Sequence, residues 1–229
     1  MAHFEVIIPV VNLGLMRKLL ISISENTLKP KRVILIDNTK ETPDKIFKEI
    51  PLGTSSNGFF TEVIYSETGL VNESLNLGAS RISKNCEYVT FLNDDIILLN
   101  CFFQRNLELF ESNEKCGVTV PRTVHTMEEL SKGKVAPQMI RKREGWAMTI
   151  RKSLLDIVPP IPCDRIATFH GDDWIWYHTV PDGNFWFKDA GNVIYHQVGA
   201  SIARLGFRRH KRPEKNEFRK IALEKGWTG

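Results

Sequence analysis

The first hundred residues contain four short apolar runs: FEVIIPV (4–10), RVILID (32–37), FFTEVIYS (59–66) and YVTFL (88–92). They recur every 28 residues, from Phe4 through Arg32 and Phe60 to Tyr88. Short, continuous apolar segments are typical of strands that are covered on both faces of a parallel sheet. The runs therefore predict the core of an α/β fold.

The intervals between the runs carry helix signals. Residues 16–26 and 73–84 have spaced apolar side chains, and Thr42 followed by Pro43 matches an N-cap and a first-turn proline. Strands that alternate with helices indicate doubly wound architecture. We expect a single α/β domain with a mostly parallel sheet flanked by helices.

Polar, turn-forming residues follow three of the runs: Val11-Asn12, Asp37-Asn38-Thr39 and Asn93-Asp94-Asp95. In sheets of this kind, ligands bind beyond the carboxyl ends of the strands. Any one of these turns alone would be ordinary, since Asn and Asp are common turn residues. Three on one edge predict a binding crevice.

The second half of the chain is less regular and richer in aromatic residues. We expect a strand at 117–121, a polar loop at 123–143, an apolar segment WAMTIR (146–151), a short helix at 153–157, a helix in HGDDWIWYH (170–178), and two strands, NFWFKDA (184–190) and NVIYH (192–196). This organisation suggests a nucleotide-binding half (1–100) and an acceptor half (101–203) of one domain (1–203).

Length and composition limit the class of protein. A chain of 229 residues suits one domain with a sizeable core. It has no apolar run near the roughly 20 residues that span a bilayer and no signal-peptide pattern, so we expect a cytoplasmic protein. Its four cysteines lie far apart, which argues against a zinc site or a disulfide framework. The net charge is uneven, with +6 in a basic tail at 204–229 and −2 in the first 203 residues.

Two carboxylates follow the fourth run directly, in FLNDDIIL (91–98). Carboxylate oxygens hold hard divalent cations, and such a cation neutralises a diphosphate leaving group. The alternative is a surface turn in which an Asp caps the following helix. The neighbouring polar strand ends favour the metal site.

A second acidic pair, Asp172 and Asp173, stands at the predicted start of a helix beside Trp174 and Trp176. Carboxylates are favourable at the amino end of any helix, so capping is one interpretation. The other is catalytic: a carboxylate takes the proton of an acceptor hydroxyl, and the indole rings offer flat surfaces to a sugar.

Three further features concern the same region. His196 closes a strand and is a candidate metal ligand, and Trp146 begins a segment that we expect to contact the acceptor, together with Trp174. The loop 68–72 opens a helix whose amino end could receive a phosphate or a ribose. No G-x-G-x-x-G or Walker pattern occurs, so dinucleotide and P-loop sites lack support.

Taken together, these segments resemble family-2 glycosyltransferases of the GT-A fold, over roughly residues 4–201. Six motifs occur in the family's order: Pro9-Val10-Val11-Asn12, Asp37-Asn38-Thr39, Asn76-Leu77-Gly78, Asn93-Asp94-Asp95 (the D-x-D position), Gly171-Asp172-Asp173 (the acidic E-D position) and His196-x-x-Gly199-x-Ser201. Six short motifs in the correct order are much more specific than any one of them.

The resemblance implies an inverting transfer of a sugar from a nucleotide diphosphate donor, with a UDP-sugar favoured, to an acceptor hydroxyl. Asp95 and His196 would bind Mn²⁺ or Mg²⁺, and Asp173 would be the catalytic base, next to Asp172. The nucleotide-sugar site would be formed by Pro9, Val11, Asn12, Asp37, Asn38, Asn72, Asn76, Asn93 and Asp94, with Asp37 reading the base and Asp94 facing the ribose and diphosphate.

Three positions depart from the family's pattern. Asn93 replaces the first acid of the D-x-D motif, and the E-D pair reads Asp-Asp. Ser74-Leu75-Asn76 replaces the usual Ala-Arg-Asn segment, so the arginine contact to the base is missing. These changes affect donor-base specificity more than the reaction class.

Other classes stay open. A nucleotidyltransferase also uses an α/β sheet and metal-binding carboxylates, but it releases pyrophosphate from a nucleoside triphosphate. A non-catalytic carbohydrate or nucleic-acid binding module would keep the fold without turnover. The acceptor is open among a glycan, a lipid-linked saccharide and a modified nucleic-acid base. The basic tail is a solvated helix, a lid over the diphosphate, or a patch for an anionic partner.

Overall fold

The computed structural model describes residues 2–41, 43–50, 58–99, 101–126, 138–139, 145–180, 185–197 and 211–227. The strands are β1 (Phe4–Val10), β2 (Arg32–Asp37), β3 (Phe60–Tyr65), β4 (Tyr88–Leu92), β5 (Ile96–Leu98), β6 (Cys116–Val124), β7 (Gln138–Met139), β8 (Ala147–Arg151) and β9 (Phe185–His196). The helices are α1 (Leu13–Glu25), α2 (Pro43–Glu49), α3 (Val71–Ala79), α4 (Phe102–Ser112), α5 (Lys152–Leu155), α6 (Gly171–Thr179) and α8 (Lys211–Glu224).

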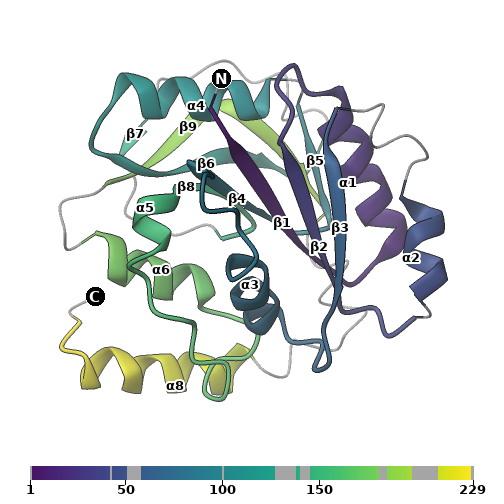
Figure 1. The fold of residues 1–229 in the computed structure, drawn as a ribbon. Helices are drawn as coiled ribbons and strands as arrows, with labels where there is room; N and C mark the ends of the chain where they lie inside the picture. The colour runs from purple at the N-terminus through teal and green to yellow at the C-terminus, as the bar shows by residue number, and fades with distance from the viewer. Residues whose placement is uncertain are drawn as a thin grey trace.

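All strands belong to one sheet, in the order β3-β2-β1-β4-β8-β6-β9-β5, with β7 paired to β9 (Figure 1). The four strands predicted from the apolar runs are β1 to β4, and they pair in parallel. Beyond β4 the sheet is mixed, because β8 runs antiparallel to both β4 and β6 while β9 runs parallel to β6. The predicted single α/β domain is confirmed, and its regular parallel part is the first half.

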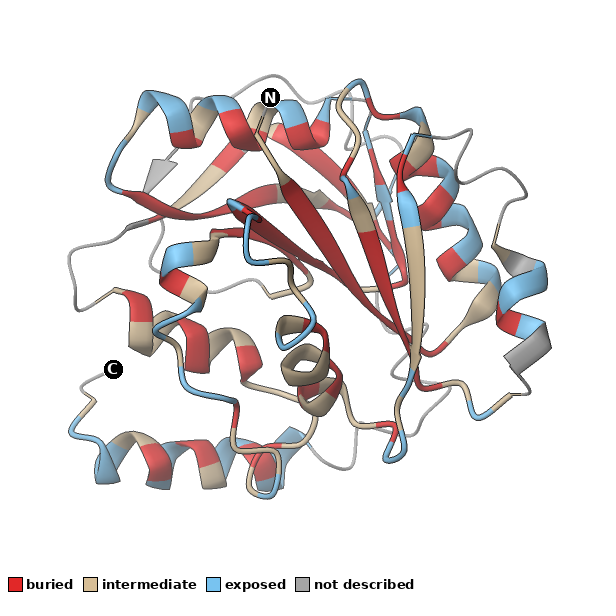
Figure 2. Ribbon diagram, in the orientation of Figure 1, coloured by how far each residue is buried: buried red, intermediate tan, exposed pale blue. Residues whose placement is uncertain are grey.

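Alternate side chains of β1 enter two different cores. Val6 and Ile8 pack with α1, α2 and α4 on one face, and Ile7 packs with α3, α5 and α6 on the other. The central strands are buried along their length because helices cover both faces (Figure 2). Gly78 of α3 allows a close approach to β1, since a Cβ there would lie 2.4 Å from Cγ2 of Ile7.

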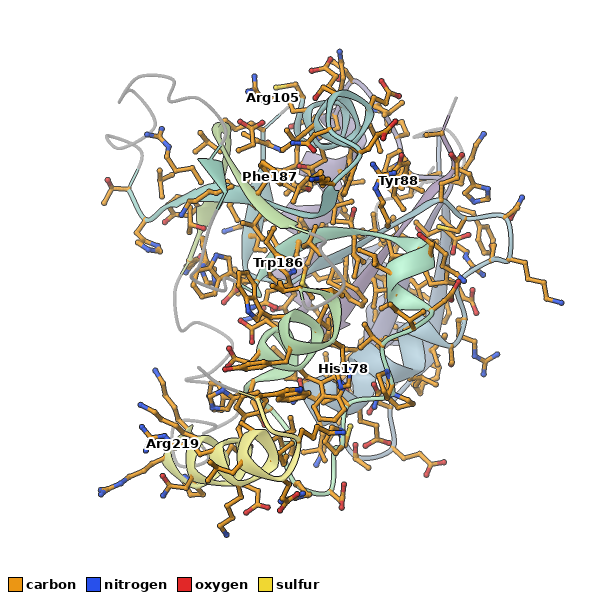
Figure 3. All side chains as sticks on the ribbon, turned by 90° about the vertical axis from the view of Figure 1, so that its left-hand side faces the viewer. Tyr88, Arg105, His178, Trp186, Phe187 and Arg219 are labelled. Atoms are coloured by element: carbon orange, nitrogen blue, oxygen red, sulfur yellow. The ribbon has the colours of Figure 1, made fainter. Side chains whose placement is uncertain are left out.

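Helix α8 in the basic tail is docked on the domain by one face. Phe218 and Ile221 are buried against Trp174 of α6, and the Trp227 ring stacks on Tyr177 at 4.6 Å. Figure 3 shows α8 alongside α6, with Arg219 on the outward side. The interpretation of the tail as a solvated helix therefore holds only for its outer face.

Several predicted boundaries were wrong. Helix α3 ends at Ala79 rather than near 84, and the two strands predicted at 184–190 and 192–196 are one strand, β9. Residues 123–124 belong to β6 rather than to a loop. Most of the predicted loop 123–143 lies outside the described residues, as do Thr42, Gly199 and Ser201.

The following two observations, on membrane spans and on cysteines, apply only to the described residues. No helix in these ranges is long and apolar enough to cross a membrane. The four cysteines are free thiols, and burial raises the pKa of both Cys86 and Cys116 to about 12.

Candidate functional site

A cavity of about 370 Å³ lies at the carboxyl ends of β1 and β4, beside α3 and the start of α6. Pockets of about 300–1,000 Å³ are typical of small-molecule sites. The wall includes nine residues predicted from the sequence: Pro9, Val11, Asn72, Asn93, Asp94, Asp95, Trp146, Asp172 and His196. Asp95 and Asp172, from opposite halves of the chain, therefore share one cavity.

Asp95 and His196 meet in the wall of this cavity. Oδ1 of Asp95 lies 3.2 Å from Nε2 of His196, and the two side chains are only 4 % and 8 % exposed. Strand pairing brings them together, because β5 runs antiparallel to β9 with Ile96 opposite His196. The Gln197 amide also donates to the Asp95 carbonyl. The sheet itself thus sets the separation of the pair.

The indole of Trp146 supports the imidazole. The two rings stack with their centroids 5.2 Å apart, and Nε1 of Trp146 donates to the Thr123 hydroxyl at 2.8 Å. The position of Trp146 is consistent with contact to a ligand in the cavity. It also restricts the rotation of His196.

The pair fits a divalent cation. Oδ1 of Asp95 is buried and makes no hydrogen bond, although Nε2 of His196 lies 3.2 Å away, and such an unpaired group costs about 1–3 kcal/mol. A carboxylate oxygen beside an imidazole nitrogen offers a ligand set that suits Mn²⁺, and the carboxylate also suits Mg²⁺. The part of the chain that the structure describes has no group of three or more His, Cys, Asp or Glu that could hold a metal. Within the described residues, Asp95 and His196 are the pair that would hold the cation.

Asp94 fixes the turn that follows β1. Its side chain is buried, and Oδ2 accepts hydrogen bonds of 2.7 Å from the amides of Val11 and Asn12. Asn12 in turn caps α1, because Oδ1 accepts from the Leu15 amide. Asp94, which the resemblance places next to the ribose and diphosphate, thus also links the end of β4 to the end of β1.

The two acids at the start of α6 occupy different positions. Asp172 lines the cavity and packs closely on Gly145, where a Cβ would lie 2.5 Å from the Cβ of Asp172. Burial, together with the charge of Asp173, raises the pKa of Asp172 to about 6. Asp173 is not a lining residue; its Oδ2 lies 2.6 Å from Nδ1 of His170.

The raised pKa of Asp172 predicts that this carboxylate lowers stability. A carboxyl whose pKa is higher in the folded state loses stabilisation as the pH rises from about 4 through about 6. Asp172→Asn is therefore expected to raise the free energy of unfolding at pH 7.5 by about 1–3 kcal/mol, with a smaller gain at pH 5. Urea unfolding at both pH values measures this. The control is Asp156→Asn, whose exposed carboxylate pairs with Lys152 and should give no such gain. No gain at pH 7.5, or an equal gain at both, would contradict the expectation.

Besides Asn12, three residues expected in the nucleotide-sugar site do not line the cavity. The Asn38 amide is 2.9 Å from the Ser74 hydroxyl, Asn76 exchanges two 2.9 Å hydrogen bonds with the backbone of Ile161, and Oδ1 of Asp37 accepts from the Thr39 amide. Each side chain is engaged within the protein. Their contacts with a nucleotide stay predictions.

Trp174 lies in the core rather than in the cavity. Its side chain is buried, Nε1 donates to the Pro159 carbonyl at 2.8 Å, and its ring meets Trp227 edge-on. The expected contact with an acceptor is thus not supported by this position, and Trp174 instead joins α6 to α8.

Two ionisable lining residues, His170 and Lys211, were not predicted from the sequence. His170 directly precedes the Gly171-Asp172-Asp173 motif, which is a local signal that could have identified it. Lys211 begins α8, and only the docking of that helix brings it to the cavity. No spacing in the sequence indicates this contact.

The sheet and its flanking helices have the fold of the GT-A glycosyltransferases, as two solved structures show. A structure of GalNAc-T7 with UDP, GalNAc and Mn²⁺ shares the fold with a TM-score of 0.69 and 14 % identity, over 86 % of this chain and 44 % of that one. Staphylococcus aureus TarS (1–349) with UDP gives a TM-score of 0.63 and 16 % identity, over 94 % and 65 %.

The chain belongs to glycosyl transferase family 2, whose family model matches residues 5–171. A comparison with curated proteins gives no match. The chain spans about 37–65 % of the length of four similar solved structures.

Proposed function

We propose that the protein transfers a sugar from a nucleotide diphosphate donor, with a UDP-sugar favoured, to an acceptor hydroxyl with inversion. The observation that carries this is the shared cavity: the Asp95–His196 pair and the acidic start of α6 line one space. UDP is present in the structures of GalNAc-T7 and TarS, and Mn²⁺ in that of GalNAc-T7, which supports the choice of donor and metal.

Each side of the cavity has a separate task in this proposal. Asp95 and His196 would hold Mn²⁺ or Mg²⁺, which neutralises the charge that develops on the departing diphosphate. Asp172 offers carboxylate oxygens to sugar hydroxyls beside the Trp146 ring. A base at the start of α6 would take the proton from the hydroxyl of the acceptor substrate. The resemblance gives this role to Asp173. Single displacement inverts the anomeric carbon because attack and departure occur on opposite sides.

The nucleotide would occupy the ends of β1 and β4. Pro9, Val11, Asn72, Asn93 and Asp94 line the cavity there. Asn12 lies next to them, with its amide held by Asp94. We keep Asp37 as the contact to the base, and Asn38 and Asn76 as further residues of the nucleotide-sugar site. To contact a nucleotide, these three side chains would have to break their present hydrogen bonds.

We also propose that the catalytic domain is 1–203, with nucleotide-binding and acceptor halves that divide near residue 100, and that the tail is 204–229. The outer face of α8 exposes Arg212, Lys215, Arg219 and Lys220, which suits an anionic partner. The acceptor classes remain a glycan, a lipid-linked saccharide and a nucleic-acid base. The cytoplasmic location stays a prediction.

A panel of nucleotide sugars, each with Mn²⁺ and with EDTA, tests this function by release of nucleoside diphosphate. We expect one donor to be consumed, and only with metal. Release of pyrophosphate from a nucleoside triphosphate would instead indicate a nucleotidyltransferase, which the family match does not favour. Metal-independent release would overturn the assigned site.

A further inference from the structure

His170 has an unusual backbone at the entrance to α6. Its φ of 66° places it in the left-handed region, which costs a residue other than glycine about 1–3 kcal/mol at a functional site. Neighbouring contacts hold it there. Glu214 of α8 accepts from the amides of Thr168 and Phe169 at 2.9 and 2.7 Å, and the Phe218 ring stacks on the imidazole at 5.0 Å. The fold therefore supports a strained position at the cavity wall.

The contact with Asp173 sets the chemistry of the imidazole. A carboxylate only accepts hydrogen bonds, so the 2.6 Å contact from Asp173 Oδ2 requires the proton on Nδ1 of His170. In the neutral imidazole, Nε2 then carries a lone pair. It makes no hydrogen bond within the described chain and is shielded from solvent, although His170 lines the cavity. This nitrogen is a hydrogen-bond acceptor without a donor.

We propose that His170 takes the proton of the acceptor hydroxyl, and that Asp173 acts through it as a positioning residue. This rests on the proposed function and refines it, because Asp173 does not line the cavity whereas His170 does. The proposal also explains why Asp173, the acid at the position of the family's E-D motif, contacts a histidine. An imidazole oriented by a carboxylate is a recurrent form of general base.

The step balances as a single displacement. The acceptor O–H bond breaks and its proton moves to Nε2 of His170. The oxygen's electron pair forms the bond to the anomeric carbon, while the bond from that carbon to the diphosphate breaks and its electrons leave with the nucleoside diphosphate. Asp173 stabilises the imidazolium, which then loses its proton to water.

The test uses His170→Gly, since glycine adopts the left-handed backbone without strain and leaves space for free imidazole. The assay follows nucleoside diphosphate release from the donor that the parent consumes. We expect a loss of about 10²–10⁴-fold in His170→Gly, and at least about tenfold recovery with added imidazole. The same addition to the parent controls for metal binding by imidazole. The double variant with Asp173→Asn should not recover.

Activity of His170→Gly close to that of the parent would overturn the proposal and return the base role to Asp173. A loss that imidazole does not restore, or a recovery that is independent of Asp173, would also overturn it. Calorimetry of UDP binding with Mn²⁺ distinguishes a failure of the His170 proposal from a failure of the proposed function. Binding retained in His170→Gly leaves the metal and donor site intact, whereas a parent that consumes no donor defeats the proposed function itself.

Discussion

Asp95→Ala is expected to remove turnover and metal dependence together. The substitution deletes the carboxylate oxygen that lies 3.2 Å from His196 Nε2, so one of the two proposed protein ligands is lost. Charge neutralisation by a metal contributes several kcal/mol to such a reaction, which corresponds to a loss of about 10³-fold or more. Release of nucleoside diphosphate and calorimetric binding of UDP, each with and without Mn²⁺, measure the two effects.

The fold should survive this change. The Gln197 amide bonds to the backbone carbonyl of Asp95, which the substitution keeps. His125→Ala is a suitable control, because it removes a ring whose centroid lies 6.1 Å from that of His196 while both proposed ligands remain. We expect that control to stay within about tenfold of the parent. Full activity in Asp95→Ala would show that the metal, if used, is held elsewhere.

Asp173→Asn is expected to lose turnover by about 10²–10⁴-fold while Mn²⁺-dependent UDP binding stays near that of the parent. The amide is close in size to the carboxylate, but it lacks the charge that holds the Nδ1 proton and stabilises an imidazolium at His170. Asp173 does not line the cavity, so the donor site should remain intact. Rates and binding constants for the same preparation separate the two quantities.

This result also distinguishes an enzyme from a binding module. A non-catalytic module would bind the same ligand before and after the substitution and show no turnover in either form. The control is Asp156→Asn, an exposed acid near α5 that should leave both rate and binding unchanged. Undiminished turnover in Asp173→Asn would show that Asp173 takes no part in the reaction.

The first half of the fold could be predicted from the sequence because its signals are local. Runs such as FEVIIPV are buried on both faces, and that burial is visible as continuous apolar sequence. β9 was predicted as two strands that are separated at Gly191. The strand continues through it, with a register shift opposite Pro121 and Arg122 of β6 and with Arg105 bound to Asp189. Pairing with a distant strand overrides that predicted break.

The candidate site was predictable where a motif coincides with the end of a strand, as at Asp95, or with the start of a helix, as at Asp172. His196 reaches Asp95 only through the β5–β9 pairing, for which the resemblance was the available guide. The position of Trp174 was not predictable, because its partner Trp227 follows helix α8, whose docking depends on long-range contacts. The same docking explains why Lys211 was missed.

Anomalous scattering from Mn²⁺ in crystals grown with UDP tests the central claim most directly. We predict a single strong peak coordinated by Oδ1 of Asp95 and Nε2 of His196, in the cavity that Asp172 also lines. Bound UDP with the manganese peak away from this pair would contradict the assignment.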